Sequence, residues 1–134
     1  MTKRQIILAR IILVLYLAAV AVLCFANIKS TPDIRKEFFG IATDKIAHFL
    51  MFLPLPILAF FAFDKYTDKV WTSILCTLIT FACGVGIAAL TEVVQSRLPY
   101  RSGDHRDFAA DLLALGLSSV LVLIIDITKQ KKST

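Results

Sequence analysis

The sequence has little charge and few cysteines for its length, and each shortage excludes a class of protein. Only 19% of its 134 residues are charged and 57% are hydrophobic, whereas a soluble domain averages about 25% charged residues. Three cysteines lie inside apolar segments, with no CxxC spacing and no neighbouring histidine: Cys24, Cys76 and Cys83. The cysteines therefore indicate neither a zinc site nor a redox site, and we expect them to be small packing residues.

The sequence also lacks a continuous basic stripe, although its net charge is +5. Its basic residues lie in loops and at the ends of apolar segments, where membrane topology places them, so nucleic-acid binding is not indicated. The apolar residues form four blocks, each close to the roughly 20 residues that a helix needs to cross a bilayer. These patterns predict an all-α polytopic membrane protein, a four-transmembrane-helix bundle that forms a single domain over 1–134. The expected helices span about 6–26, 45–63, 70–92 and 107–127.

The first apolar block can be interpreted as a cleaved signal peptide or as a retained helix. Its uninterrupted apolar run, 11–26, is longer than the roughly 7–15 residues in the apolar core of a signal peptide. We therefore expect a retained helix.

Two local features predict how the helices bend and pack. Pro54 and Pro56 lie in the middle of the second block, which predicts a kink or a packing face halfway across the membrane. Small residues in "CGVGIAA" (83–89) and "GLSS" (116–119) predict close contacts between helices.

The number of spans determines which segments share a membrane face. Four spans put both termini on one side and the connections before the second and fourth helices on the other. Basic residues are divided almost evenly between the two sides, so their number alone does not decide the orientation. The basic start of the chain, with Lys3 and Arg4 before the first helix, favours cytoplasmic termini.

Ionisable residues gather at the ends of three of the apolar blocks. They lie in "DKIAHF" (44–49), "EVVQ" (92–95) and "DHRDFAAD" (104–111), and the expected topology brings all three segments to the outer face. Residues three or four apart share one face of a helix. Asp104, Asp107 and Asp111 can therefore form one stripe that enters the bilayer, and Asp44 and His48 share a face in the same way.

Charged side chains inside a bilayer are costly, at about 2.5–3.5 kcal/mol for a central Asp on insertion scales, and they usually face the bundle interior and pair. We expect the acids of this region to pair with basic residues or to hold protons. The acids are Glu92, Asp107 and Asp111, and the candidate bases are Lys45, Arg101 and Arg106.

Other interpretations of these residues stay open. A salt-bridge network that only fixes the helices would need the same side chains, and an Asp near a helix N-terminus is favoured by the helix dipole alone. A divalent metal site is also chemically reasonable, although no HExxH or comparable spacing supports it, and we predict neither a metal nor another cofactor. Its candidate ligands are His48, Glu92, Asp104, His105 and Asp107.

In these segments the sequence resembles the VanZ-like membrane protein family. The family pattern begins one helix with D-K-x-x-H-F and continues with E-x-x-Q and a short linker containing Pro and Arg. It ends with D-x-x-D and a further Asp or Asn before a small-residue helix. The matching residues are Asp44, Lys45, His48, Phe49, Glu92, Gln95, Pro99, Arg101, Asp104, Asp107 and Asp111, with Gly116 after them. The resemblance covers about 44–123, and Pro54, Pro56, Ala114 and Leu115 depart from the pattern.

The resemblance implies a multi-pass protein of the bacterial inner (cytoplasmic) membrane that works at the cell envelope, and the basic start of the chain places both termini in the cytoplasm. The founding member of the family is linked to low-level resistance to teicoplanin. This lipoglycopeptide acts on cell-wall precursors at the outer face of the membrane. The resemblance brings no established reaction with it.

The function that we favour from the sequence is an outward-facing polar site that binds or modifies an anionic envelope molecule. Its partner would be a membrane lipid, through its headgroup, or a lipid-linked envelope precursor carrying a glycan. Burial can turn a histidine or carboxyl group into an acid–base catalyst, and the candidates are His48, Glu92 and Asp107. The candidate binding residues are Asp44, Lys45, Gln95, Arg101, Asp104, Arg106 and Asp111.

Two alternatives belong to other functional classes. The first is a non-catalytic structural or accessory membrane subunit, able to form a homo-oligomer, whose charged residues only fix helix packing. The second, a proton-coupled transporter, is disfavoured because the acids cluster on one side and the sequence shows no inverted repeat. The residues alone do not distinguish binding from catalysis.

Overall fold

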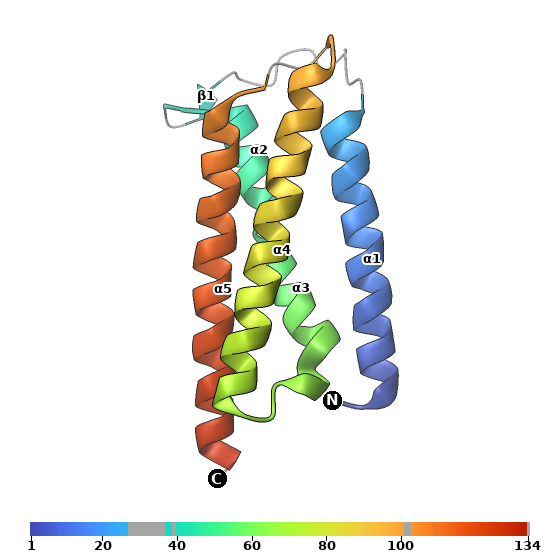
Figure 1. Cartoon of the computed structure of the whole chain (residues 1–134), viewed down its shortest axis with the longest axis vertical. Coiled ribbons are helices and arrows are strands. Elements are labelled where there is room, and N and C mark those ends of the chain that lie inside the picture. The colour runs from blue at the N-terminus through green and yellow to red at the C-terminus, as the bar shows by residue number, and fades with distance from the viewer. Residues whose placement is uncertain (27–36, 39, 101–102, 134) are drawn as a thin grey trace.

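Four long helical spans lie side by side and form a bundle (Figure 1). The computed structural model describes residues 1–26, 37–38, 40–100 and 103–133. Its α-helices are α1 (Lys3–Phe25), α2 (Thr43–Phe52), α3 (Pro54–Phe63), α4 (Val70–Arg97) and α5 (His105–Ser133), and η1 (Asp64–Tyr66) is a short 3-10 helix. Within these ranges β structure is limited to two antiparallel two-residue strands, β1 (Glu37–Phe38) and β2 (Ile41–Ala42). The predicted all-α four-helix bundle is confirmed.

Four stretches are long and apolar enough to cross a membrane: Lys3–Phe25, Asp44–Tyr66, Val70–Arg97 and His105–Lys132. Many of their large aliphatic side chains lie on the outside of the bundle, and Val14 and Leu15 of α1 are 65% and 64% exposed. A continuous aliphatic surface is unfavourable in water and suited to lipid. The chain is therefore a multi-pass membrane protein.

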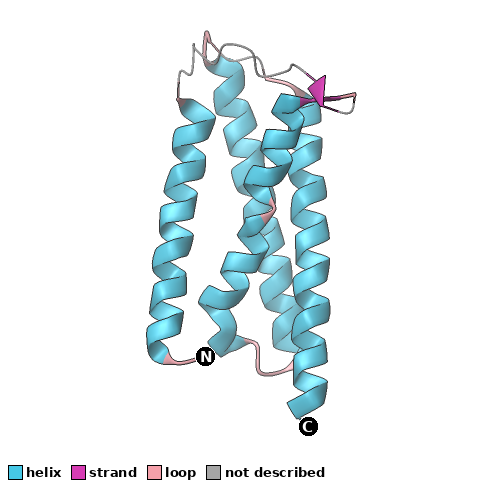
Figure 2. Cartoon of the chain, turned by 180° about the vertical axis from the view of Figure 1, so that it is seen from behind, coloured by secondary structure: helices cyan, strands magenta, loops and turns pink. Residues whose placement is uncertain are grey.

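The second span is divided into α2 and α3 at Leu53 (Figure 2). Proline has no N–H to donate to the carbonyl four residues earlier, and Pro54 and Pro56 both lie in the first turn of α3. The hydroxyl of Tyr16, on α1, donates a hydrogen bond to the carbonyl of Met51 next to this break. The carbonyls that Pro54 and Pro56 leave without an intrahelical donor are those of Leu50 and Phe52, so the bond from Tyr16 adds a contact at the interruption but does not replace the missing ones. The division at Leu53 agrees with the kink or packing face that the two prolines predicted.

The two ends of the bundle carry different segments. Both termini lie at one end (Figure 1), where the amino group of Met1 and Nζ of Lys129 contact opposite oxygens of Asp64 at 3.2 and 3.1 Å. The β1–β2 hairpin lies at the other end, and Gly40, with φ +76°, occupies its turn. α2 and α5 both begin at that end, which sets the position of their polar residues.

The core between the helices depends on one close approach. A Cβ atom built at Gly84 of α4 would lie 2.7 Å from Cδ2 of Leu115 in α5 and 3.2 Å from Cδ2 of Leu55 in α3. Built at Gly86 or Gly116, it would meet nothing within 4 Å. Of the two predicted small-residue segments, the first therefore packs through Gly84, and the second places buried Ser118 and Ser119 inside the bundle.

Gly84→Leu is expected to destabilise the bundle, whereas the matched variant Gly86→Leu is not. Overpacking a core costs about 1–3 kcal/mol, because the leucines against Gly84 must move. Thermal unfolding of the detergent-solubilised chain would show a lower midpoint for Gly84→Leu alone. Equal midpoints for the two variants would contradict this packing.

Candidate functional site

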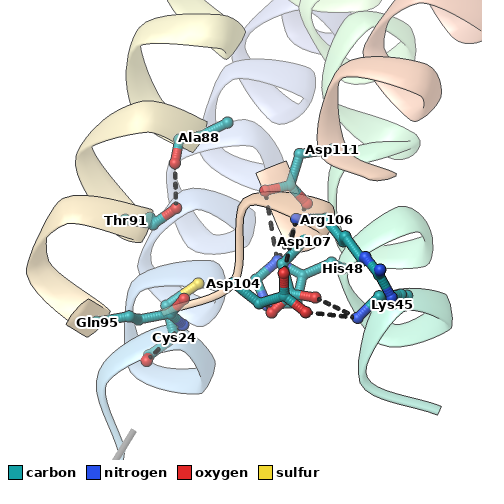
Figure 3. A network of polar contacts seen from close by, with 10 residues as sticks. All are labelled: Cys24, Lys45, His48, Ala88, Thr91, Gln95, Asp104, Arg106, Asp107 and Asp111. Atoms are coloured by element: carbon teal, nitrogen blue, oxygen red, sulfur yellow. Dashed lines mark hydrogen bonds and ion pairs between the residues drawn. The ribbon is translucent and has the colours of Figure 1, made fainter. Parts of the chain in front are cut away.

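Polar side chains from α2 and α5 meet where these two helices begin (Figure 3). We call this set the α2–α5 cluster, and its members are Asp44, Lys45, His48, Asp104, Asp107 and Asp111. One helical turn separates Asp44 from His48, and another separates Asp107 from Asp111, so each helix directs two of these side chains to the same side. Asp104 lies directly before α5, and its Oδ1 accepts a hydrogen bond from the backbone N–H of Arg106 at 2.9 Å.

Lys45 joins the two helix starts. Its Nζ lies 2.9 Å from Oδ2 of Asp104 and 3.4 Å from Oδ1 of Asp107. The hydrogen bond from the Arg106 backbone, together with that from the Lys45 ammonium, lowers the pKa of Asp104. Asp104 is therefore held in its charged form at the edge of the cluster.

His48 connects two carboxylates inside the bundle. Its Nδ1 lies 3.1 and 3.3 Å from the two oxygens of Asp111, and its Nε2 lies 3.8 Å from Oδ2 of Asp107. The exposed fractions of His48, Asp107 and Asp111 are 4%, 2% and 1%. Ionisable groups this deeply buried require partners, and here each lies beside another member of the cluster.

Asp44 completes the cluster from the surface side of α2. One of its oxygens lies within 4.8 Å of ligand atoms of His48 and Asp107, and its carboxyl group interacts with that of Asp107. One ammonium group, that of Lys45, thus accompanies the carboxylates of Asp44, Asp104, Asp107 and Asp111. This excess of negative charge must be balanced by protons or by a cation.

The other predicted site residues lie outside the cluster. Gln95 is buried on α4, and its Nε2 donates a hydrogen bond to the carbonyl of Cys24 on α1 at 2.9 Å (Figure 3). Glu92 lies against Gly103, where a Cβ would be 3.0 Å from its Oε1, and its buried Oε2 has no hydrogen-bond partner among the described residues. Gln95 therefore contacts α1, whereas Glu92 lies beside the residue that precedes Asp104 of the cluster.

The predicted arginines have different outcomes. Arg106 is exposed and contacts Asp104 through its backbone N–H. Its guanidinium forms no ion pair with an acid in the described part of the chain, and of the three candidate bases Lys45 is the one found paired there. Arg101 lies outside the described residues.

A second polar group, which the sequence analysis did not predict, lies at the terminal end of the bundle. Nε2 of Gln130 donates to the carbonyl of Thr67 and to Oγ of Ser73, at 2.8 and 2.7 Å. Buried Asp126 lines a cleft of about 470 Å³ beside them. The signal available in the sequence was Asp126 itself, an acid at the far end of the last apolar block from Asp107 and Asp111.

A comparison with known proteins identifies a relative in yeast. The chain is 32% identical over 81 residues to an uncharacterized protein of the fission yeast Schizosaccharomyces pombe. The match covers 60% of this chain and 47% of the yeast protein, so the chain spans about half the length of the relative that it matches. No protein-family model matches the sequence, and no solved structure does.

Proposed function

We propose that this chain is a VanZ-like protein of a bacterial cytoplasmic membrane, and that its α2–α5 cluster binds or modifies an anionic envelope molecule. The ligand would be a lipid headgroup or a lipid-linked glycan at the outer face. The observation that carries the proposal is the burial of His48, Asp107 and Asp111 together at one end of the bundle. Ionisable residues at such a depth in membrane proteins are usually functional.

Each part of the cluster has a chemical role in this proposal. His48 is positioned by Asp111 and can transfer a proton, because its second nitrogen faces Asp107 and Asp44. Arg97 and Arg106 are exposed at the same end, and guanidinium groups bind phosphate or carboxylate oxygens in a bidentate manner. An anionic headgroup would thus meet cations at the surface before reaching the buried acids.

The test is Asp107→Asn, which keeps the shape of the side chain and removes its charge. Native mass spectrometry of the chain, purified in mild detergent, would report the phosphate-bearing lipids that it retains. We expect Asp107→Asn to lower this retention about tenfold, which corresponds to about 1.4 kcal/mol, because the loss of the carboxylate removes the contacts that position the cationic groups Lys45 and His48. Asp68→Asn, an exposed position at the opposite end, is the matched control and should retain lipid like the unmodified chain.

Unchanged retention by a folded Asp107→Asn protein would contradict the proposal. A contribution to teicoplanin resistance belongs to the same proposal and rests on the family resemblance alone. In a bacterial host that expresses the chain, Asp107→Asn should then reduce the minimal inhibitory concentration of teicoplanin to that of cells without the protein.

A structural or accessory role is the second candidate, and a specific observation favours it. The contacts of Lys45 with Asp107 and of His48 with Asp107 and Asp111 all cross from α2 to α5. The same side chains therefore fix how these helices pair. In this role Asp107→Asn would lower the melting temperature or break an oligomer, and the purified chain would retain no particular lipid.

A further inference from the structure

We propose that Asp44, His48 and Asp107 bind a divalent transition-metal ion. One ligand atom from each residue lies within 4.8 Å of those of the other two. Three atoms this close lie at most about 2.8 Å from a common centre, so shifts of less than 1 Å would bring them to the roughly 2.0–2.2 Å typical of metal bonds to nitrogen and carboxylate oxygen.

The orientation of His48 points independently to a ligand. Its Nδ1 is occupied by Asp111 at 3.1 Å, and its Nε2 is 3.8 Å from the nearest oxygen of Asp107, which is too long for a hydrogen bond. The side chain is 4% exposed, so this nitrogen is directed at two carboxylates in the interior without a hydrogen-bond partner in the described ranges. A carboxylate that fixes one imidazole nitrogen while the other faces a cation is the usual arrangement around metal-binding histidines.

The charge of the cluster also favours a cation at this position. The carboxyl groups of Asp44 and Asp107 lie close together, and two carboxylates at such a distance repel unless a proton or a cation lies between them. Lys45 does not fill this role, because its ammonium lies closer to Asp104 than to Asp107. It also contacts Oδ1 of Asp107, whereas His48 faces Oδ2. A divalent ion would neutralise both carboxylates and use the free nitrogen of His48.

The ligand set indicates which ions fit. Imidazole nitrogen suits zinc, carboxylate oxygen suits manganese, and calcium and magnesium prefer shells of oxygen alone. One imidazole with two carboxylates therefore fits Zn²⁺ or Mn²⁺. Three protein ligands leave room for one more oxygen atom. We infer that this oxygen belongs to the phosphate of the lipid headgroup, which the carboxylates alone would repel. This step rests on the proposed function.

Metal titration of the full chain tests this inference. The protein in mild detergent is stripped with EDTA, dialysed and titrated with Zn²⁺ or Mn²⁺ by isothermal calorimetry, with elemental analysis of the bound metal. We expect one ion per chain, and at least a tenfold loss of affinity in Asp44→Asn and His48→Gln. Asp44 is exposed, so its substitution keeps the fold intact. His105, a candidate ligand in the sequence, is exposed at the start of α5 and is no member of the three-residue group. His105→Gln is therefore the matched control and should bind like the unmodified chain.

Binding of no ion by the unmodified chain, or equal binding by Asp44→Asn, would overturn the inference. Lipid retention measured with and without Zn²⁺ separates this result from the proposed function. Retention of phosphate-bearing lipid by a chain that binds no metal ion would contradict the metal site and leave the proposed function standing. Stoichiometric metal that Asp44→Asn abolishes, without any retained lipid, would support the metal site and contradict the proposed function.

Discussion

His48→Ala is expected to lower the free energy of unfolding by roughly 3–5 kcal/mol, because removing one partner of a buried ion pair leaves the other without compensation. Asp111 is 1% exposed and His48 is 4% exposed. The two oxygens of Asp111 lie 3.1 and 3.3 Å from the imidazole, and the described residues offer this carboxylate no other base. Unfolding in detergent micelles, followed by circular dichroism against denaturant concentration, measures the loss.

The double variant His48→Leu with Asp111→Leu provides the decisive comparison. Replacing both members of a buried pair by apolar residues is often neutral or stabilising, so the double variant should recover most of the stability that His48→Ala loses. His105→Ala, at an exposed position, should stay within about 0.5 kcal/mol of the unmodified chain. If His48→Ala unfolds at the same denaturant concentration as the unmodified chain, the buried contact with Asp111 does not exist.

The same double variant separates the two candidate functions. A purely structural network can be replaced by leucines without loss, because packing is all that it provides. A binding site cannot, because leucine neither transfers a proton nor binds a cation or phosphate. A stable double variant that retains no lipid would therefore favour the binding site over the accessory role.

The parts of the site that the sequence predicted are those fixed by local geometry. The helical period places Asp44 with His48 and Asp107 with Asp111 whatever surrounds them. The number of spans then brings the starts of α2 and α5 to one end of the bundle. The division of the second span likewise follows from Pro54 and Pro56 alone, since the missing N–H groups are a property of the residues themselves.

The positions of Glu92 and Gln95 could not be predicted in this way. Their spacing puts them near the same helix face, but which neighbour that face meets depends on how α4 is rotated against the rest of the bundle. That rotation is set by the close approach of Gly84 to Leu115 and Leu55, which is a contact between distant segments. Gln95 consequently reaches α1, and Glu92 lies against Gly103.

The terminal polar contacts were missed because a helix end was misjudged. The last helix was expected to stop at about 127, with a basic tail after it, because the apolar block ends there. α5 instead continues to Ser133, which carries Gln130 to Thr67 and Ser73 and Lys129 to Asp64. These polar contacts with distant segments stabilise the last turns of α5, and a count of apolar residues along the sequence does not reveal them.

Single cysteines introduced at the two ends of the bundle are expected to give opposite labelling. Arg106 and Asp68 are both exposed, and they lie at the start of α5 and before α4, at opposite ends of the molecule. With Cys24, Cys76 and Cys83 replaced by alanine, a membrane-impermeant maleimide added to intact bacterial cells should label Arg106→Cys completely. It should label Asp68→Cys only after the cells are lysed.

This result decides whether the cluster can meet an envelope ligand at all. The basic start of α1, at Lys3 and Arg4, favours the cytoplasm for the terminal end, and the α2–α5 cluster must then face outward because the described spans separate the two ends. Labelling of Asp68→Cys in intact cells, with Arg106→Cys protected, would reverse the orientation. A site exposed to the cytoplasm could not reach a lipid-linked precursor at the outer leaflet, however well its residues were arranged to bind one.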